Sequence, residues 1–355
     1  MTVCGPVPTA SLGTTSMHDH VLAVLAPFFH KPLSAEERAA CPIDIDAPLS
    51  VENLCYLNRC GLRGRNLDNW DLGDVALMQR EVAHFKARGG GAILEPGAPG
   101  IRGDVAGLRR IAQATGVHII ASTGLYVRDS WPERFHGMDE AGFRAYLRRE
   151  IGEGMDGTDI RAGHIKTAIR HGVDEEMRFL RPTVEVARES GLLVTAHTSG
   201  YTEPARRQAM LDAFLAHGMD PARLLFCHLQ FTFLQTDPVR LLLEPGLHAI
   251  HLDWAKRLLD AGVNVCIDLF GSPSDHEDNV RLAGLILLLR AGYARQIVIG
   301  NDVYQKALTR AGGGFGYAGM LDFAVPGLRR HGVSEADIRT ILVDNPARLL
   351  QIDGG

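Results

Sequence analysis

The amino-acid sequence predicts a single (β/α)8 barrel domain that spans residues 1–355. From residue 75 onward, a helical stretch that ends in glycine is followed repeatedly by a short run of apolar and β-branched residues. Eight such runs can be counted, and no composition break or Pro/Ser-rich linker divides the chain. An open parallel sheet remains an alternative, because periodicity does not show whether a sheet closes.

The repeated unit is clearest where glycine ends a helix. Residues 75–88 carry apolar side chains at helical spacing before the glycines at 89–91, and residues 105–115 and 177–190 end at Gly116 and Gly191. The eight candidate strands are 14–20, 92–95, 118–123, 164–169, 192–197, 224–228, 263–269 and 297–302.

One long connection departs from this pattern. The segment 21–74 is rich in Pro, Asp, Asn and Arg and is far longer than an ordinary strand-to-helix loop. In a barrel it would emerge at the carboxyl ends of the strands, where active sites form, so Arg63, Arg65 and Trp70 are candidates to cover a pocket. An irregular surface excursion is the alternative interpretation.

Composition and charge narrow the partners and the compartment. A formal net charge of -5 with no basic cluster argues against nucleic acid or an anionic membrane as a partner. The apolar stretches 20–29 and 282–289 are too short to span a bilayer, and the N-terminus lacks the pattern of a signal peptide, so a cytoplasmic protein is expected. The six cysteines include no Cys-x-x-Cys pair and are expected to be free thiols.

Residues that can bind metal follow the predicted strands. His18 and His20 alternate on one strand face and can hold one metal. Lys166, His197, His228 and Asp302 stand near the ends of later strands, on the same mouth of a barrel. Singly, the histidines fit a packed core, Asp302 fits a helix cap, and Lys166 fits an ammonium that reaches solvent or a carboxylate. Together they supply two adjacent divalent sites with mixed nitrogen and oxygen ligands.

A family resemblance adds to this interpretation. The chain resembles the phosphotriesterase family of the amidohydrolase superfamily over nearly its whole length, and more narrowly the bacterial resiniferatoxin-binding, phosphotriesterase-related proteins. The motifs that carry the resemblance are Leu12-Gly13-Thr14, His18-Asp19-His20, Ser122-Thr123-Gly124-Leu125-Tyr126, Ile165-Lys166-Thr167-Ala168, Ala196-His197-Thr198, Cys227-His228-Leu229, Ile267-Asp268, Gly292-Tyr293, Asn301-Asp302 and Ile341-Leu342-Val343-Asp344-Asn345-Pro346.

The resemblance implies a binuclear metal centre. His18, His20 and Asp302 would bind the more buried ion, His197 and His228 the more exposed one, and a carboxylated Lys166 would bridge them. The ions would be zinc, with manganese, cobalt or iron as alternatives. A hydroxide shared by such ions would attack a carboxylic ester, lactone or phosphoester, and Asp302 would orient it and accept its proton. Barrels of this resemblance often form dimers, so a homodimer is one alternative, and a monomer in which the apolar helix 282–289 packs against its own barrel is the other.

Two positions depart from the family pattern. Glu95 stands where many relatives carry an aspartate, and it is either a supporting carboxylate or an alternative bridging ligand. Asn301 stands where many carry a histidine, which weakens the case for a proton relay from that position. Tyr126, Arg128 and Trp131, together with the segment 230–251, are expected to shape the substrate pocket.

Two other functions stay open at the level of sequence. One is a non-catalytic small-molecule binding protein of the resiniferatoxin type on the same barrel. The other is an enzyme with a single metal that hydrolyses an amide or deaminates a ring, although Lys166 favours the binuclear kind. The number of metals per chain distinguishes these functions: two for the ester hydrolase, one for the deaminase-like enzyme and none for the binding protein.

Overall fold

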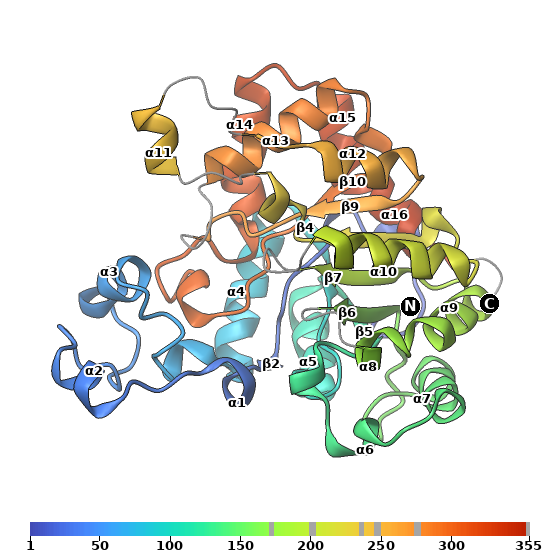
Figure 1. The fold of residues 1–355 in the computed structure, drawn as a ribbon, viewed down its shortest axis with the longest axis horizontal. Helices are drawn as coiled ribbons and strands as arrows, with labels where there is room; N and C mark the ends of the chain where they lie inside the picture. Colours follow the sequence, from blue (N-terminus) through green and yellow to red (C-terminus); the bar gives the residue numbers. More distant parts are fainter. Residues whose placement is uncertain (170–173, 199–203, 234–237, 245–249, 273–277, 353–355) are drawn as a thin grey trace.

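Eight parallel strands form the centre of the fold. The computed structural model describes residues 1–352 except 170–173, 199–203, 234–237, 245–249 and 273–277 (Figure 1). The strands follow the sheet order β1-β4-β5-β6-β7-β8-β9-β10. They are β1 (Thr14–Ser16), β4 (Gly90–Glu95), β5 (His118–Gly124), β6 (His164–Ile169), β7 (Val194–Thr198), β8 (Leu224–Cys227), β9 (Asn264–Ile267) and β10 (Ile297–Ile299).

The two edge strands of this sheet meet, so the sheet forms a nearly closed barrel. The Met17 amide donates a hydrogen bond to the Ile299 carbonyl at 3.0 Å, which links the chain after β1 to β10. Gly300 allows the chain after β10 to lie close to the chain after β1, because a Cβ at this position would lie 2.8 Å from the His18 backbone nitrogen. The predicted (β/α)8 barrel is therefore confirmed, and the open sheet is not observed.

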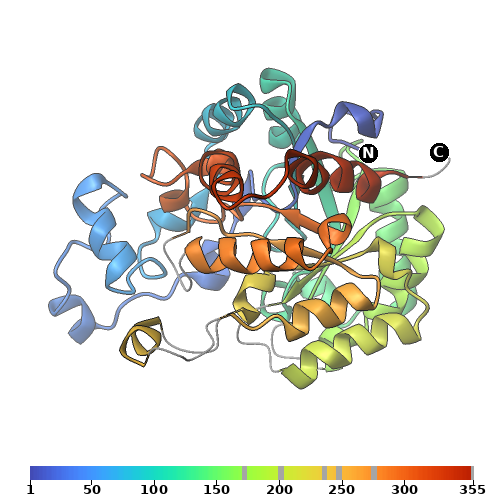
Figure 2. The same cartoon turned by 90° about the horizontal axis from the view of Figure 1, so that it is seen from above.

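The helices surround the strands (Figures 1 and 2). Those that follow the barrel strands along the chain include the glycine-terminated helices that the sequence predicted. The helices of the described chain are α1 (Ala26–Phe29), α2 (Ala35–Ala39), α3 (Val51–Arg59), α4 (Val75–Ala87), α5 (Val105–Thr115), α6 (Glu133–His136), α7 (Glu140–Gly152), α8 (Asp174–Met177), α9 (Leu180–Ser190), α10 (Pro204–Ala216), α11 (Pro238–Leu243), α12 (Asp253–Asp260), α13 (Asp278–Arg290), α14 (Val325–Arg330), α15 (Glu335–Arg339) and α16 (Asn345–Leu350).

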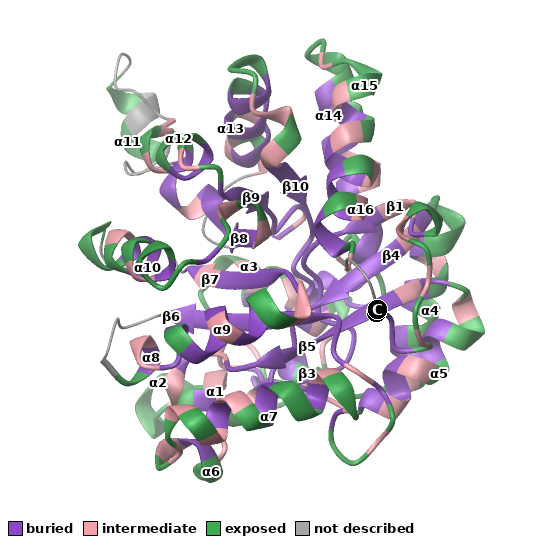
Figure 3. Cartoon of the chain, turned by 90° about the vertical axis from the view of Figure 1, so that its right-hand side faces the viewer, coloured by how far each residue is buried: buried purple, intermediate pink, exposed green. Residues whose placement is uncertain are grey.

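Side chains on the strands alternate between two apolar clusters, and the strands are buried on both faces (Figure 3). On β4, for example, Ile93 packs in the larger cluster and Leu94 in the smaller one, and Ile119 and Ile120 divide in the same way on β5. The smaller cluster fills the barrel interior, while the larger one packs the strands against the helices.

Four barrel strands, β1, β8, β9 and β10, end earlier than predicted on the side where the site lies, whereas β4, β5, β6 and β7 end at the predicted residue or one residue later. β1 ends at Ser16 and β10 at Ile299, so His18, His20 and Asp302 lie in the loops that follow these strands. Contacts from elsewhere in the fold hold this part of the chain, including a 2.8 Å hydrogen bond from the Asp302 amide to the His18 carbonyl. Apolar patterning does not record such contacts, which explains the overestimated strand lengths.

The segment 21–74 is structured and is not a simple loop. It contains α1, α2 and α3, and its ends are joined by antiparallel pairing of β2 (Ala23–Val24) with β3 (Asp71–Leu72). The Ala307 amide donates to the Asn69 side-chain oxygen at 2.8 Å, which attaches the segment to the loop after β10. The segment therefore lies beside the carboxyl ends of the strands, as predicted for a pocket cover.

Three smaller expectations have outcomes in the structure. The helix predicted at 177–190 is divided, because α8 ends at Met177 and α9 begins at Leu180. All six cysteines are free thiols, as predicted. None of the described helices is long and apolar enough to cross a membrane.

Candidate active site

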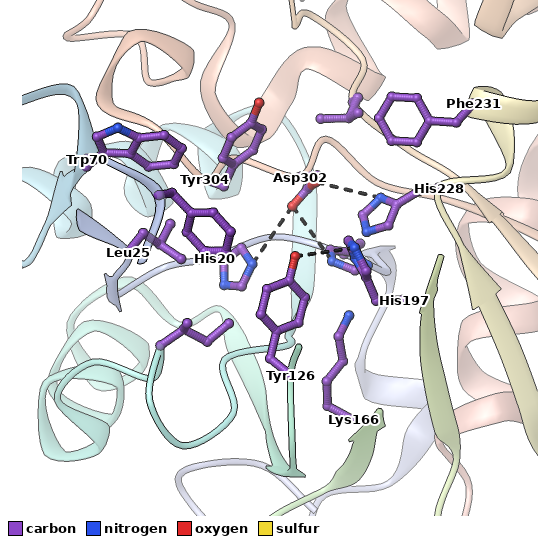
Figure 4. Close-up of a pocket in the computed structure, with 14 residues that line it drawn as sticks. His20, Leu25, Trp70, Tyr126, Lys166, His197, His228, Phe231, Asp302 and Tyr304 are labelled. Atoms are coloured by element: carbon purple, nitrogen blue, oxygen red, sulfur yellow. Dashed lines mark hydrogen bonds and ion pairs between the residues drawn. The ribbon is translucent and has the colours of Figure 1, made fainter. Parts of the chain in front are cut away.

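All six residues predicted to bind metal line one pocket at the carboxyl ends of the barrel strands (Figure 4). The cavity has a volume of about 170 Å³. Its floor, defined by these six side chains, consists of His18, His20, Lys166, His197, His228 and Asp302. The convergence arises because parallel strands bring residues that are far apart in the sequence to one mouth.

Asp302 lies at the centre of the floor. Its Oδ1 is 3.7 Å from His18 Nε2 and 3.9 Å from His20 Nε2, and its Oδ2 is 3.7 Å from His228 Nδ1. One donor atom each from His18, His228 and Asp302 lies within 4.8 Å of the other two. These separations exceed a hydrogen bond, so Asp302 does not satisfy the three histidines that lie around it. Such a set of nitrogen and oxygen donors suits a divalent metal ion.

Lys166 enters the floor from β6. Its side chain is 1% exposed, and its Nζ has no hydrogen-bond partner among the residues that the structure describes. Gly124 makes the packing feasible, because a Cβ at this position would lie 2.0 Å from the Lys166 carbonyl oxygen. Burying an ammonium without a hydrogen-bond partner costs free energy.

Burial also controls protonation on the floor. It lowers the pKa of His18 well below its usual value, and the nearby charge of Lys166 adds to the effect. It raises the pKa of Asp302 despite the opposing influence of His228. A neutral imidazole offers a free nitrogen lone pair, so the protonation state of His18 is the one that metal ligation requires.

Two carboxylates lie behind the floor and orient its histidines. Asp268 Oδ1 is 2.8 Å from His228 Nδ1, and Glu95 Oε1 is 3.2 Å from His20 Nδ1. Glu95 also accepts hydrogen bonds from the Val21 amide and, at 2.8 Å, from the Gly97 amide. Both oxygens of Glu95 are engaged behind His20, which favours a positioning role over the bridging role considered from the sequence.

Asn301 and Asp19 form a support below the loop that carries Asp302. The Asn301 amide nitrogen donates to Asp19 Oδ2 at 2.9 Å and to the Tyr317 carbonyl, and its Oδ1 accepts from the Met320 amide. Burial raises the pKa of Asp19 to about 7. All three hydrogen bonds of the Asn301 side chain hold the loop in place. This structural role explains why an amide stands here, although a proton relay would need a titratable group.

The backbone is strained where the floor residues leave their strands. His228, Leu269 and Asp302 have positive φ values of 64°, 64° and 49°. Such left-handed conformations cost non-glycine residues free energy and cluster at functional sites. Here they turn the chain sharply at the ends of β8, β9 and β10.

The rest of the pocket lining is apolar. Leu25, Phe29 and Trp70 come from the segment 21–74, and the others come from loops after barrel strands. This apolar wall consists of Leu25, Phe29, Trp70, Ile101, Tyr126, Phe231, Leu269 and Tyr304.

The three residues expected to shape the substrate pocket differ in position. Tyr126 lies on the wall, with its hydroxyl 3.3 Å from His197 Nε2. Trp131 lies behind it and donates from its indole nitrogen to the Tyr126 carbonyl at 2.7 Å. Arg128 is turned away from the cavity and pairs with Glu175. From the segment 230–251, Phe231 reaches the cavity; residues 234–237 and 245–249 lie outside the described residues.

Of the three residues expected to cover the pocket, one reaches it. Trp70 lines the cavity, whereas Arg65 donates hydrogen bonds to the carbonyls of Lys31 and Pro32 within its own segment. Arg63 is buried within that segment and is absent from the described pocket lining.

Several site residues were not predicted from the sequence. Asp268 had a visible signal, because an aspartate directly after an apolar strand faces the barrel mouth, yet only its place in a motif was noted. Phe29, Ile101 and Tyr304 had none, because their positions depend on loop paths that one sequence does not specify.

A pocket of titratable side chains at the carboxyl ends of a (β/α)8 barrel defines the class of barrel enzymes. The chain belongs to the phosphotriesterase family, whose model matches residues 1–350. It is 28% identical to an N-acetyltaurine hydrolase of Tetraodon nigroviridis over 351 residues, which cover 98% of this chain and 97% of that protein. These findings support a hydrolase.

Solved structures of related proteins agree with the assignment of the chain to this family. A resiniferatoxin-binding protein from Rhodobacter sphaeroides matches with a TM-score of 0.87 and 30% identity, over 100% of this chain and 96% of the other. A mutant of a phosphotriesterase-like lactonase from Deinococcus radiodurans matches with a TM-score of 0.73 and 25% identity, over 99% of both chains.

Proposed function

We propose that this protein is a metal-dependent hydrolase that cleaves a carboxylic ester or lactone, with phosphoesters as a further class of substrate. The observation that supports this proposal best is the buried Lys166 Nζ without a described partner, in one pocket with four imidazoles and the Asp302 carboxylate. After the ammonium loses a proton to solvent, the free amine would add carbon dioxide to form a carbamate and release a second proton. The carbamate anion would pair with bound metal cations, and the unpaired buried charge would be replaced by a paired one.

In this proposal the floor would hold two divalent ions. His18, His20 and Asp302 would hold one, His197 and His228 the other, and carboxylated Lys166 both. Zinc is the first choice for such mixed nitrogen and oxygen donors, with manganese, cobalt or iron as alternatives. When bound, ions of this kind supply an activated water near neutral pH and polarise the scissile carbonyl or phosphoryl group.

The chain's own residues would perform the remaining tasks. The Asp302 carboxylate, with both oxygens directed into the floor, would accept the proton of the attacking water. The Tyr126 hydroxyl beside His197 is placed to donate a hydrogen bond to a substrate oxygen. The apolar wall would exclude bulk water from the reacting groups.

A second candidate reaction is amide hydrolysis. It is favoured by the names of the curated relatives, N-acetyltaurine hydrolases at 26–28% identity over at least 98% of this chain. An amide and an ester present the same carbonyl to the floor, so the distinction depends on the leaving group. The binding-protein alternative has one similar structure in its favour, the resiniferatoxin-binding protein. The complete set of six donor residues supports catalysis over binding alone.

The proposal is tested by metal content and turnover together. Wild-type protein and the Lys166→Ala variant would be purified, analysed for metal per chain, and assayed on lactones, aryl esters, an amide and a phosphotriester. Leu287→Ala provides a control, because this exposed leucine on α13 does not line the pocket. We expect two ions per chain in wild type and in the control, and loss of metal and hydrolysis in Lys166→Ala.

Each other outcome has a distinct meaning. A wild type without metal that stays inert after zinc or manganese is added would contradict the proposal and favour the binding protein. One ion per chain with amide turnover would favour the single-metal enzyme. Two ions that survive the loss of Lys166 would assign the bridge to another group, with Glu95 the first to be tested.

A further inference from the structure

The apolar wall carries information about the substrate that the floor does not. Outside the six floor residues, every described residue that lines the pocket is aliphatic or aromatic. The polar side-chain atoms of the wall residues are the hydroxyls of Tyr126 and Tyr304 and the indole nitrogen of Trp70, which donates to the Gly64 carbonyl at 3.2 Å. Within the described lining, the wall therefore contributes no arginine, lysine or carboxylate. It offers surface for an apolar group and no counter-ion for a charged one.

Ring contacts join the wall into one surface. Phe29 stacks against Trp70 with centroids 5.7 Å apart and planes at 27°, and Trp70 contacts Tyr304 at 6.1 Å. Phe29 also meets Tyr126 edge-on at 6.1 Å. Figure 4 shows Trp70, Tyr304 and Tyr126 around the floor residues. The rings hold one another in place, so the wall is preformed for an aromatic or aliphatic group.

The cavity between the described residues has room for a small apolar group. The volume of about 170 Å³ is close to that of an apolar protein cavity of about 150 Å³ that accommodates benzene. The floor occupies one side of this space and would contact the scissile bond. The wall would then cover about one six-membered ring or a short alkyl chain.

We infer that the substrate carries an uncharged apolar ring or short chain beside its scissile bond, and that the pocket rejects a sulfonate or carboxylate at that place. This inference rests on the proposed function and specifies its substrate class. An anionic group against the wall would be desolvated without a partner, because the cationic part of the site lies at the floor with the scissile group. A hydroxyl would be rejected far less, since hydrophobic pockets discriminate poorly against one added hydroxyl.

The inference separates this chain from its curated relatives. N-acetyltaurine carries a sulfonate two carbons from its amide nitrogen, and a site for it needs a group that pairs with that charge. None of the described wall residues offers one. Identity of 28% to the Tetraodon nigroviridis hydrolase leaves ample room for a different wall.

Two matched substrate pairs test the inference on wild-type protein with metal restored. Phenyl acetate is compared with 4-sulfophenyl acetate, and N-propylacetamide with N-acetyltaurine. In each pair the scissile bond is the same and the sulfonate lies at the far end of the leaving group. The sulfonated phenol is the better leaving group, so chemistry alone favours the charged ester. We expect kcat/KM to favour the neutral ester by at least about tenfold.

A positive charge placed on the wall should weaken this preference for the neutral ester. Phe29→Arg introduces a guanidinium among the rings and is expected to reduce the neutral-to-sulfonated ratio of kcat/KM by at least about tenfold. Phe315→Arg is the matched control, because Phe315 is 44% exposed and does not line the pocket. This control should keep the wild-type ratio. The wild-type pairs decide the inference on their own if Phe29→Arg does not fold.

Failure of this inference can be distinguished from failure of the proposed hydrolase function. Turnover with equal or higher kcat/KM for the sulfonated ester or for N-acetyltaurine would overturn this inference and leave the hydrolase proposal standing. A protein that contains two metals and hydrolyses none of the four compounds, nor any lactone, other aryl ester or phosphotriester, would overturn both.

Discussion

The Asp268 carboxylate lies 2.8 Å from Nδ1 of His228, a side chain on the floor of the pocket. It also accepts a 2.6 Å hydrogen bond from the Gln230 side-chain amide, and it is fully buried. A carboxylate in this position fixes the ring orientation and tautomer of the histidine and leaves Nε2 as the nitrogen that can bind a metal. Asp268 is therefore a positioning residue behind the floor.

Replacing this carboxylate should weaken the site that contains His228. Asp268→Asn keeps the size of the side chain but removes its negative charge, so His228 becomes a poorer and less well oriented ligand. We expect metal affinity or kcat/KM to fall by about 10- to 100-fold. Titration of metal into the chelated protein measures the affinity. Asp260→Asn is the control, because Asp260 accepts a hydrogen bond from Tyr293 outside the pocket. Equal affinities in the two variants would refute this role for Asp268.

Glu95 provides a test of positioning against bridging. Its carboxylate accepts from two backbone amides and faces His20 Nδ1, whereas a bridging ligand would need its oxygens free for metal. We expect Glu95→Gln to lower metal affinity while Lys166 still supports two ions, because the amide group matches only some of the donors around it. Metal analysis of Glu95→Gln, Lys166→Ala and the double variant measures this.

The double variant separates the two roles. If Lys166→Ala alone keeps two ions and the double variant loses them, Glu95 acts as the bridge and the positioning role is incorrect. If Lys166→Ala already loses the metal, the bridge belongs to Lys166.

The barrel could be predicted from local patterns, whereas its closure and loop paths could not. Helices ending at Gly116 and Gly191 and apolar strands after them are local features, and both were found as expected. The extent of β1 depends on backbone bonds to distant residues, such as the Met17 amide to the Ile299 carbonyl. A sequence pattern contains no record of such partners, so the predicted strand ran on to His20.

The site also has a part that could be predicted from the sequence, the floor, and a part that could not, most of the wall. The floor residues follow apolar strands, and strand order alone brings them to one mouth, so His197, His228 and Asp302 could be placed from the sequence. The wall depends on where the segment 21–74 folds back. Trp70 was anticipated there, but Phe29 was not, because a phenylalanine in a long connection has no sequence feature that distinguishes a pocket residue from a packing residue.

A buried ion pair beside the wall makes a stability prediction. Arg102 donates from Nη1 and Nη2 to the two oxygens of Glu150 at 3.0 and 2.8 Å, and both side chains are buried. Arg102→Ala leaves the Glu150 carboxylate buried without this partner, so we expect a loss of about 3–5 kcal/mol in the free energy of unfolding. Urea-induced unfolding measures it.

The control for this variant is an exposed pair of similar geometry. Arg148 donates to Glu189 at 2.9 and 2.7 Å, but both side chains are about half exposed. Arg148→Ala should therefore change the free energy of unfolding by no more than about 1 kcal/mol. Similar losses in the two variants would show that burial does not strengthen the Arg102 pair.

His164 makes a prediction about stability and pH. Its ring lies fully buried on β6, with Nε2 donating to the Glu95 carbonyl at 3.0 Å and Nδ1 3.2 Å from the Thr195 hydroxyl. Burial lowers the pKa of His164 to about 3, whereas a histidine in the unfolded chain titrates near 6.5. Between these values the unfolded state binds a proton that the folded state does not. The stability contributed by the neutral ring is therefore complete above about pH 6.5 and is lost as the pH falls toward 3.

The variant His164→Gln removes this titration and keeps an amide that can donate to the Glu95 carbonyl. Its free energy of unfolding should be lower than that of wild type at neutral pH because packing is lost. Below about pH 6.5 it should fall less steeply with decreasing pH, by up to about 1.4 kcal/mol per pH unit. Urea-induced unfolding of chelated proteins between about pH 4.5 and 8 measures both slopes without metal release. The exposed His331 supplies the control, since His331→Gln should keep the wild-type slope. An unchanged slope in His164→Gln would mean that the buried ring takes up a proton in the folded state, and that burial does not keep it neutral.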